Sequence, residues 1–216
     1  MKKVLLFILL IINVSSVHAQ EKGEWQFRAG FGFAGYKSES NYTFKTPIGD
    51  FTDSESDGAA TVHMPLDCRY HFTNRFNAGI DFKFGRYLYE PDSAAGKSNR
   101  FAVIGFAAEY VFVARDKFRW YGGLGINSCS LILEETDDIT DDKTTLTYSG
   151  GGFRMNTGIM VKLIGGFGLN FNLGYDGHNF RLQNYEINSQ DQSLENIEAR
   201  LRVSGMDGTL GVFYKF

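Results

Sequence analysis

The sequence has little of what helical membrane proteins and nucleic-acid-binding proteins need. After the N-terminus it has no apolar stretch of the ~20 residues that a transmembrane helix requires. The most apolar segment, 101–114, is too short and is interrupted by Glu109. Only 3 prolines and 2 cysteines are present among 216 residues. Membrane residence would therefore have to be by β-strands.

The N-terminus has the pattern of a secretory signal peptide. Residues 1–3 carry two lysines, 4–14 are apolar and 17–19 end on small Ala19. This predicts a cleaved signal peptide at 1–19 and a mature domain at 20–216. A retained membrane anchor is the alternative, although no basic stop-transfer cluster follows.

The mature chain carries no excess of positive charge. Loss of Lys2 and Lys3 leaves 20 basic residues against 25 acidic ones, a formal charge of −5. This balance argues against a nucleic-acid surface. We therefore expect no nucleic-acid partner.

Glycine and aromatic residues are abundant, with 25 Gly, 20 Phe and 11 Tyr. This composition favours strands with aromatic faces over a helical bundle. The alternation of faces described next places Cys68 and Cys129 on opposite faces of non-adjacent strands. We expect two free thiols and no disulfide.

Apolar and polar residues alternate with a period of two along eight segments, as in strands with one apolar face. These segments are 25–36, 60–72, 76–84, 101–114, 118–129, 153–163, 167–178 and 195–216. In 101–114 the alternation is less regular, and we assign Ile104, Phe106, Tyr110 and Phe112 outward because that leaves Glu109 inward.

The connections between these segments alternate between long and short. Long polar ones at 37–58, 91–99, 134–149 and before the last strand are separated by tight turns at 73–75, 115–117 and 165–166. Such an order predicts an all-β, eight-stranded antiparallel up-and-down transmembrane β-barrel with both termini periplasmic. Aromatic side chains beside the short turns and termini, from Trp25 to Phe216, agree with a girdle at that end.

The last strand carries a family resemblance. In 206–216, Met206, Leu210, Val212 and Tyr214 alternate with polar residues and Gly, and the chain stops at Phe216. This resembles the small outer-membrane β-barrel family of Gram-negative bacteria, such as OmpX-like and OmpA-like barrels. The resemblance implies contact with outer-membrane lipids and lipopolysaccharide, and recognition of Phe216 by the barrel-assembly machinery. No OmpA-type periplasmic domain follows, so anchoring to the cell wall is not implied.

The main structural alternative is a secreted lipocalin-like barrel, which points its apolar face inward. The polar face, however, carries charges of both signs, many flanked by Gly, and this favours a lumen over a soluble exterior. These residues are Arg28, Asp67, Arg69, Asp81, Lys83, Glu109, Arg119, Arg154, Lys162 and Asp176.

An eight-stranded barrel is only wide enough for side chains to fill. We expect the inward charges to pair, because an isolated charge in a confined lumen is costly. The hypothesis is that Glu109 and Asp81 are held by Arg and Lys neighbours in a plug. A small gated pore is the alternative.

Enzymes of this family, the lipid A deacylases and palmitoyl transferases, imply a nucleophile and base at the lipid rim. The alternation instead places His63, His71 and His178 inward. Asp176 and His178, two apart on one face, are candidates for an acid–base pair or for a plain lumenal hydrogen bond. The sequence predicts no catalytic, cofactor-binding or metal-binding residue.

Two acidic segments invite a metal interpretation. The first, 53–58, begins like a calcium loop, but Met64 stands where the bidentate Glu is required. The second, 134–142, is either a solvated loop tip or a bridge to lipopolysaccharide through divalent cations.

The last loop, 183–203, itself alternates, for example at Ile197, Ala199, Leu201 and Val203. The apolar parity changes near Ser204, which predicts a bulge at 204–205. We expect hairpin seven–eight to project beyond the outer leaflet with a turn at 189–193, and to bind a surface protein by strand addition or to pack on neighbouring loops.

The sequence thus predicts a non-enzymatic barrel that acts in outer-membrane integrity or surface interaction. A lipid-A-modifying enzyme and a small pore or accessory subunit of a secretion system are the alternatives.

Overall fold

The computed structural model describes residues 22–89, 99–136 and 141–216. In these residues the strands are β1 (Trp25–Thr46), β2 (Gly49–His71), β3 (Phe76–Tyr89), β4 (Arg100–Ala114), β5 (Phe118–Thr136), β6 (Lys143–Ile164), β7 (Phe167–Ile187), β8 (Gln190–Asp191) and β9 (Ile197–Lys215). Within them no helix has the length and apolarity of a membrane span. The predicted signal peptide at 1–19 lies outside the described residues.

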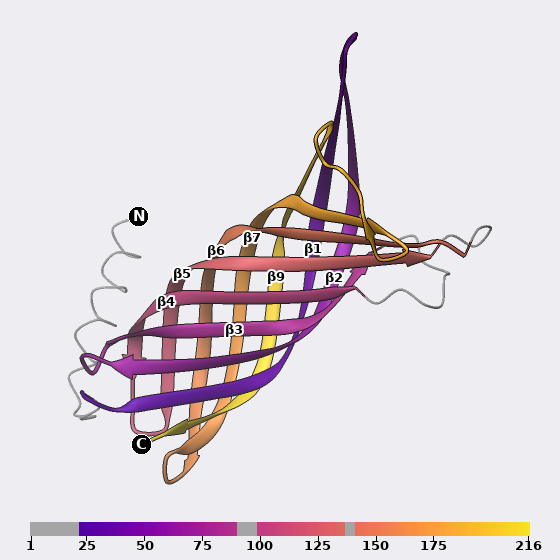
Figure 1. Cartoon of the computed structure of the whole chain (residues 1–216). Helices are drawn as coiled ribbons and strands as arrows, with labels where there is room; N and C mark the ends of the chain where they lie inside the picture. Colours follow the sequence, from indigo (N-terminus) through magenta and orange to yellow (C-terminus); the bar gives the residue numbers. More distant parts are fainter. Residues whose placement is uncertain (1–21, 90–98, 137–140) are drawn as a thin grey trace, which may run out of the picture.

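The long strands form a closed antiparallel ring (Figure 1). Strands β1 to β7 each pair with the next along the chain, β7 pairs with β9, and β9 returns to β1. The short β8 pairs with the end of β7, so β9 is the eighth strand of the ring. This confirms the predicted eight-stranded antiparallel up-and-down barrel.

The ring turns its apolar side chains outward. Ile126 exposes 72% of its surface, whereas Glu109 exposes 2%. An apolar exterior around a polar lumen is the arrangement of a barrel in lipid. The soluble lipocalin-like alternative, which requires the opposite orientation, is therefore wrong, and the outward assignment of Ile104, Phe106, Tyr110 and Phe112 is confirmed.

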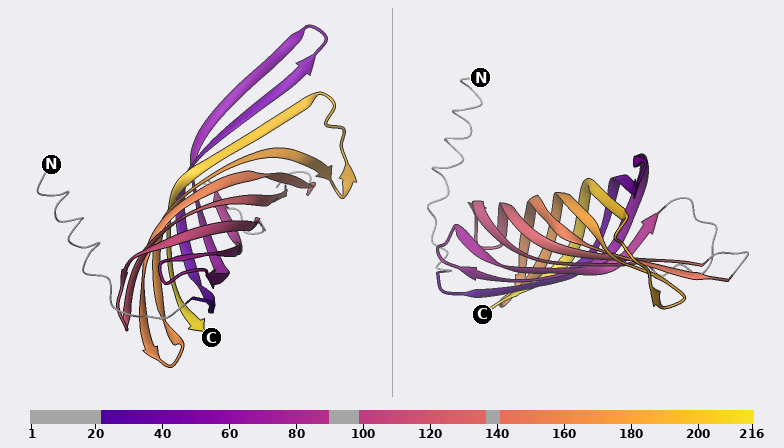
Figure 2. Two further views of the ribbon diagram at one scale, coloured as in Figure 1. Left: turned by 90° about the vertical axis from the view of Figure 1, so that its left-hand side faces the viewer. Right: turned by 45° about the horizontal axis from the view of Figure 1, so that its top comes forward.

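The two ends of the barrel differ. Short turns and the C-terminus share one end, opposite the tall β1–β2 hairpin (Figures 1 and 2). There the backbone N–H of Trp25 donates to the oxygen of Phe216 at 3.0 Å, and its oxygen accepts from the N–H of Phe216 at 3.1 Å. Aromatic rings also meet at this end, with centroids 5.1 Å apart for Trp25–Tyr70 and 5.2 Å for Phe112–Trp120. The predicted aromatic girdle beside the short turns is confirmed.

The predicted long loop at 37–58 is wrong. Here β1 and β2 continue as a ribbon paired in register from Lys37↔Gly58 to Thr46↔Gly49, leaving only Pro47 and Ile48 at the tip. The alternation that marks a strand is weak in this segment because most side chains on both faces are polar. In the same way β5 continues to Thr136 and β6 begins at Lys143, so both strands extend into the predicted loop at 134–149.

The predicted bulge at 204–205 is also wrong. β9 keeps an unbroken register with β1 from Gln26↔Lys215 to Phe44↔Ile197, and its odd residues face inward throughout. The apolar character changes sides because the surroundings change. Where lipid lies outside, apolar residues face out; where water lies outside, they face in.

The predicted projecting hairpin between the seventh and eighth strands of the ring, which are β7 and β9, is only partly present. The chain turns at Asn188 and Ser189, which both have positive φ. However, β7 and β9 pair only as far as Arg181↔Arg200. Beyond that point the arm of β7 pairs with β6 and the arm of β9 pairs with β1, so the two arms separate onto their neighbours.

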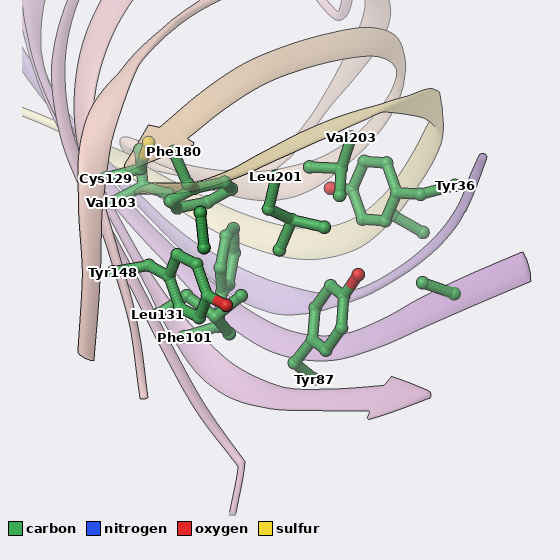
Figure 3. Packing of buried hydrophobic residues seen from close by; sticks show 13 residues of the cluster. Tyr36, Tyr87, Phe101, Val103, Cys129, Leu131, Tyr148, Phe180, Leu201 and Val203 are labelled. Carbon is green, nitrogen blue, oxygen red and sulfur yellow. The ribbon is translucent and has the colours of Figure 1, made fainter. Parts of the chain in front are cut away.

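Inward apolar side chains fill the half of the barrel on the side of the β1–β2 hairpin (Figure 3). Tyr36, Phe101, Leu131, Phe180 and Leu201 are all buried there. We call this group, with its neighbours, the outer plug. Its members are Ala34, Tyr36, Ala59, Tyr87, Phe101, Val103, Cys129, Leu131, Tyr148, Phe180, Ala199, Leu201 and Val203.

The close strand packing gives a test of the fold. A Cβ added at Gly79 would lie 1.8 Å from the backbone oxygen of Cys68, whereas one at Gly35 would meet nothing within 4 Å. We expect Gly79→Ala to lower the free energy of unfolding by roughly 1–3 kcal/mol through overpacking. Gly35→Ala is the matched control and should leave it nearly unchanged. Denaturant titrations of both variants in lipid vesicles measure this, and equal effects would contradict the packing.

Candidate functional site

The lumen holds two clusters of buried charge. The first, the Glu109 cluster, comprises Arg28, Asp67, Arg69, Asp81 and Glu109. Arg28 donates to Glu109 at 2.5 and 3.2 Å, and its Nε donates to Asp67 at 2.6 Å. Arg69 binds Asp81 and lies 3.8 Å from Glu109. The expected pairing of Glu109 and of Asp81 with basic neighbours is confirmed. The partner is an arginine in both cases.

The second, the Lys83 cluster, comprises His63, Lys83, Arg154, Asp176 and Asp207. Lys83 Nζ donates to Asp207 at 2.7 Å and also to Asp176. Arg154 lies 3.7 Å from Asp176, and His63 Nε2 lies 3.1 Å from Asp207. The alternation places Asp207 inward, but the sequence gives no sign that it is a partner of Lys83, because 124 residues separate the two.

Together these groups connect the whole ring. The two clusters draw side chains from every ring strand except β5. That strand contributes Tyr121, whose ring lies 5.2 Å from the guanidinium carbon of Arg28 and whose hydroxyl donates to Asn170 at 2.9 Å. Buried charges that are paired and hydrogen-bonded avoid the large cost of isolated ones. The network thus gives each charged group of the two clusters an oppositely charged neighbour.

Apolar groups lie on both sides of the two clusters. Toward the long loops stands the outer plug. Toward the short turns stands the inner plug, Val111, Ala114, Tyr121, Met160 and Phe213. A cavity of about 20 Å³ beside Arg28, Asp67 and Glu109 is room for about one water molecule.

The three histidines are inward and buried, as predicted. His71 pairs with Gln26 at 3.1 Å, and His63 with Thr61 at 3.2 Å. The expected Asp176–His178 pair is not formed: Asp176 binds Lys83, while His178 packs against the rings of the outer plug, 5.9 Å from Phe101. Two residues on one face of a strand point the same way, and here cross-strand cations take the carboxylate.

The structure also places the two cysteines and the acidic segment 53–58. Cys68 and Cys129 are both free, as expected. Residues 53–58 lie within β2 and form no loop. In the part of the chain that the structure describes, no group of three or more His, Cys, Asp or Glu is placed to hold a metal ion.

The Glu109 cluster predicts a strong effect of removing one charge. Glu109→Gln takes a carboxylate from Arg28 and Arg69, and should lower the free energy of unfolding by about 3 kcal/mol. Glu198→Gln, in an exposed pair with Lys45, is the control and should change it little. Denaturant titration in lipid vesicles measures both. A similar small change for the two variants would show that the lumenal pairs do not stabilise the barrel.

Comparison with known proteins agrees with this architecture. No curated protein matches the sequence significantly. Among solved structures, the outer membrane protein OprG from Pseudomonas aeruginosa is 14% identical with a TM-score of 0.61, and the match covers 92% of this chain and 98% of that one. AlkL in lipid bilayers is 13% identical with a TM-score of 0.50, covering 94% of each chain. At these identities the likeness concerns the fold.

The family model called outer membrane protein beta-barrel domain matches residues 5–216. This match agrees with the lipid-facing exterior and the closed ring of strands described above. The chain therefore belongs to the outer-membrane β-barrel protein family and resides in the bacterial outer membrane.

Proposed function

We propose that this barrel acts by contact at the cell surface and catalyses no reaction. The contact region is a projecting sheet made of residues 37–46 of β1, 49–58 of β2 and 197–204 of β9. The observation that carries the proposal is the length of this sheet beyond the lipid-facing band. Ten residue pairs of the β1–β2 ribbon, at about 3.3 Å each, give a reach of about 30 Å.

The projecting sheet is braced as a unit. The arm of β9 pairs with β1 from Ser38↔Val203 to Phe44↔Ile197. Near the tip, Lys45 Nζ donates to Glu198 at 2.5 Å, which lowers the pKa of Glu198. Figure 2 shows the arm of β9 rising beside the β1–β2 hairpin. The expected partner site at 183–203 therefore becomes part of a larger surface centred on β1 and β2.

The tip carries apolar side chains into water. Ile48 is 95% exposed, Phe51 65% and Phe44 47%. Exposed apolar groups gathered in one place favour a contact with another molecule. Their position at the far end of the ribbon puts them where a surface partner would arrive.

One edge of the sheet is open within the described residues. Residues 49–58 of β2 pair with β1, while the pairing of β2 with β3 begins only at Ala59↔Tyr89. This edge carries Asp50, Asp53, Glu55 and Asp57. An extended segment with basic side chains fits such an edge by strand addition, since backbone hydrogen bonds and charge would both be satisfied.

A pair of arginines on the outer face of the barrel supports contact with lipopolysaccharide. Arg86 and Arg100 face each other on the outward side, next to the lipid-facing pair Phe84↔Ala102. Two like charges in register are unfavourable alone. A lipopolysaccharide phosphate between them would offset that cost. We also propose that Phe216, at the seam of the ring, is the residue that the barrel-assembly machinery recognises.

The surface role is tested by photo-crosslinking in intact cells from Ile48, with exposed Asn74 in the β2–β3 turn at the opposite end as the matched control. We expect a discrete protein adduct from position 48, reduced several-fold when Phe44 and Phe51 are both replaced by Ser. Crosslinking from Ser189 separates contact by the β7–β8 turn from contact by the ribbon. Lipid-only adducts from position 48, or equal protein adducts from position 74, would contradict the proposal.

The filled lumen predicts electrical silence. Because the two plugs flank the ion clusters, the folded protein should show no steady conductance in planar lipid bilayers. Bilayers without protein give the baseline. Steady, open conductance would overturn the filled lumen and favour the pore.

A further inference from the structure

A second cavity lies at the end of the barrel that carries the short turns. It has a volume of about 450 Å³ and is bordered by the β4–β5 turn (115–117) with the start of β5, by the β6–β7 turn and by the end of β9. We call it the turn-side cavity. No role in the lumen network or at the surface accounts for it.

Positive charge dominates its lining. Five basic side chains outnumber two carboxylates, Glu24 and Asp116. The basic residues are Arg115, Lys117, Arg119, Lys162 and Lys215. Arg119 is buried, so part of this charge lies within the wall, while Lys215 lies 3.8 Å from Glu24, which offsets its charge. Charge that is shielded from bulk water attracts an anion more strongly and is screened less by salt.

Backbone hydrogen bonds hold the basic groups in place. Lys162 N donates to the oxygen of Lys117 at 2.9 Å, and Lys215 N donates to the oxygen of Gly166 at 3.0 Å. The two turns and the last strand are therefore joined into one frame. The backbone that carries the basic side chains therefore does not have to be ordered when a ligand binds.

The cavity is closed on its inner side and adjoins lipid on its outer side. Met160 and Phe213 of the inner plug line it, which separates it from the ion clusters. Phe118 also lines it and belongs to the exposed girdle of the lipid-facing surface. An anion bound here would therefore remain at this mouth, within reach of the adjoining leaflet.

We propose that the turn-side cavity is a binding site for a phosphate group. Guanidinium and ammonium groups are the side chains that bind phosphate, and the cavity accommodates a phosphate together with a small organic substituent. The phosphate has two possible sources, the headgroup of an anionic phospholipid in the adjoining leaflet or a soluble phosphate ester. Both present the same chemistry to the basic side chains.

The test uses the folded full-length mature protein and two ligand sources. In non-ionic detergent, glycerol phosphate is titrated by calorimetry. In nanodiscs, native mass spectrometry counts retained phosphatidylglycerol against phosphatidylcholine. Binding of glycerol phosphate alone assigns a soluble source, and retention of phosphatidylglycerol assigns the lipid. Binding of neither overturns the site.

Variants connect the binding to the cavity. Replacing exposed Lys117 and Lys162 together by Gln removes two of the five basic side chains and should weaken binding roughly ten-fold or more. Arg75→Gln, in a turn outside the cavity, is the matched control and should bind as the unmodified protein does. Circular dichroism verifies that each variant is folded. Unchanged affinity in the double variant, or an equal loss in Arg75→Gln, would overturn the proposal.

Discussion

Lipid offers no hydrogen-bond partners to a peptide backbone, and the closed ring is the answer to that constraint. The seam between β1 and β9 supplies these backbone partners along its whole length. Its register is unbroken, and two terminal hydrogen bonds join Trp25 and Phe216. Closure with eight strands leaves a lumen only wide enough for side chains. The closed ring follows from this pairing requirement, and the filled lumen follows from closure with eight strands.

The solvent outside the wall then decides which residues occupy each face. Along β9 the backbone keeps one alternation, but its composition changes. Leu210 and Val212 face lipid, whereas Leu201 and Val203, further along the same strand, face the lumen. The lumen is correspondingly ionic at membrane depth and apolar above it. A single strand thus follows two opposite rules for burial, one for hydrocarbon and one for water.

Local periodicity was enough to predict what local chemistry controls. It placed Glu109 inward, the aromatic rings beside the short turns, and the order of the ring strands. It could not find the β1–β2 ribbon, because residues 37–58 are polar on both faces and resemble a loop. It misread the change in β9 as a bulge, because periodicity alone does not report what lies outside. Periodicity could not predict the Lys83 cluster, because its members come from strands that are distant in the sequence.

The Lys83 cluster also has a consequence for the order of assembly. Its carboxylates lie 93 and 124 residues after the lysine, and Asp207 belongs to the last strand of the ring. While the chain emerges, Lys83 and Arg154 exist without the partners that would compensate their burial. A partly built wall would have to keep this stretch hydrated. The arrival of β9 therefore completes the Lys83 cluster with Asp207 in the same event that seals the seam, so barrels that lack β9 are disfavoured by incompletely compensated charge in this cluster.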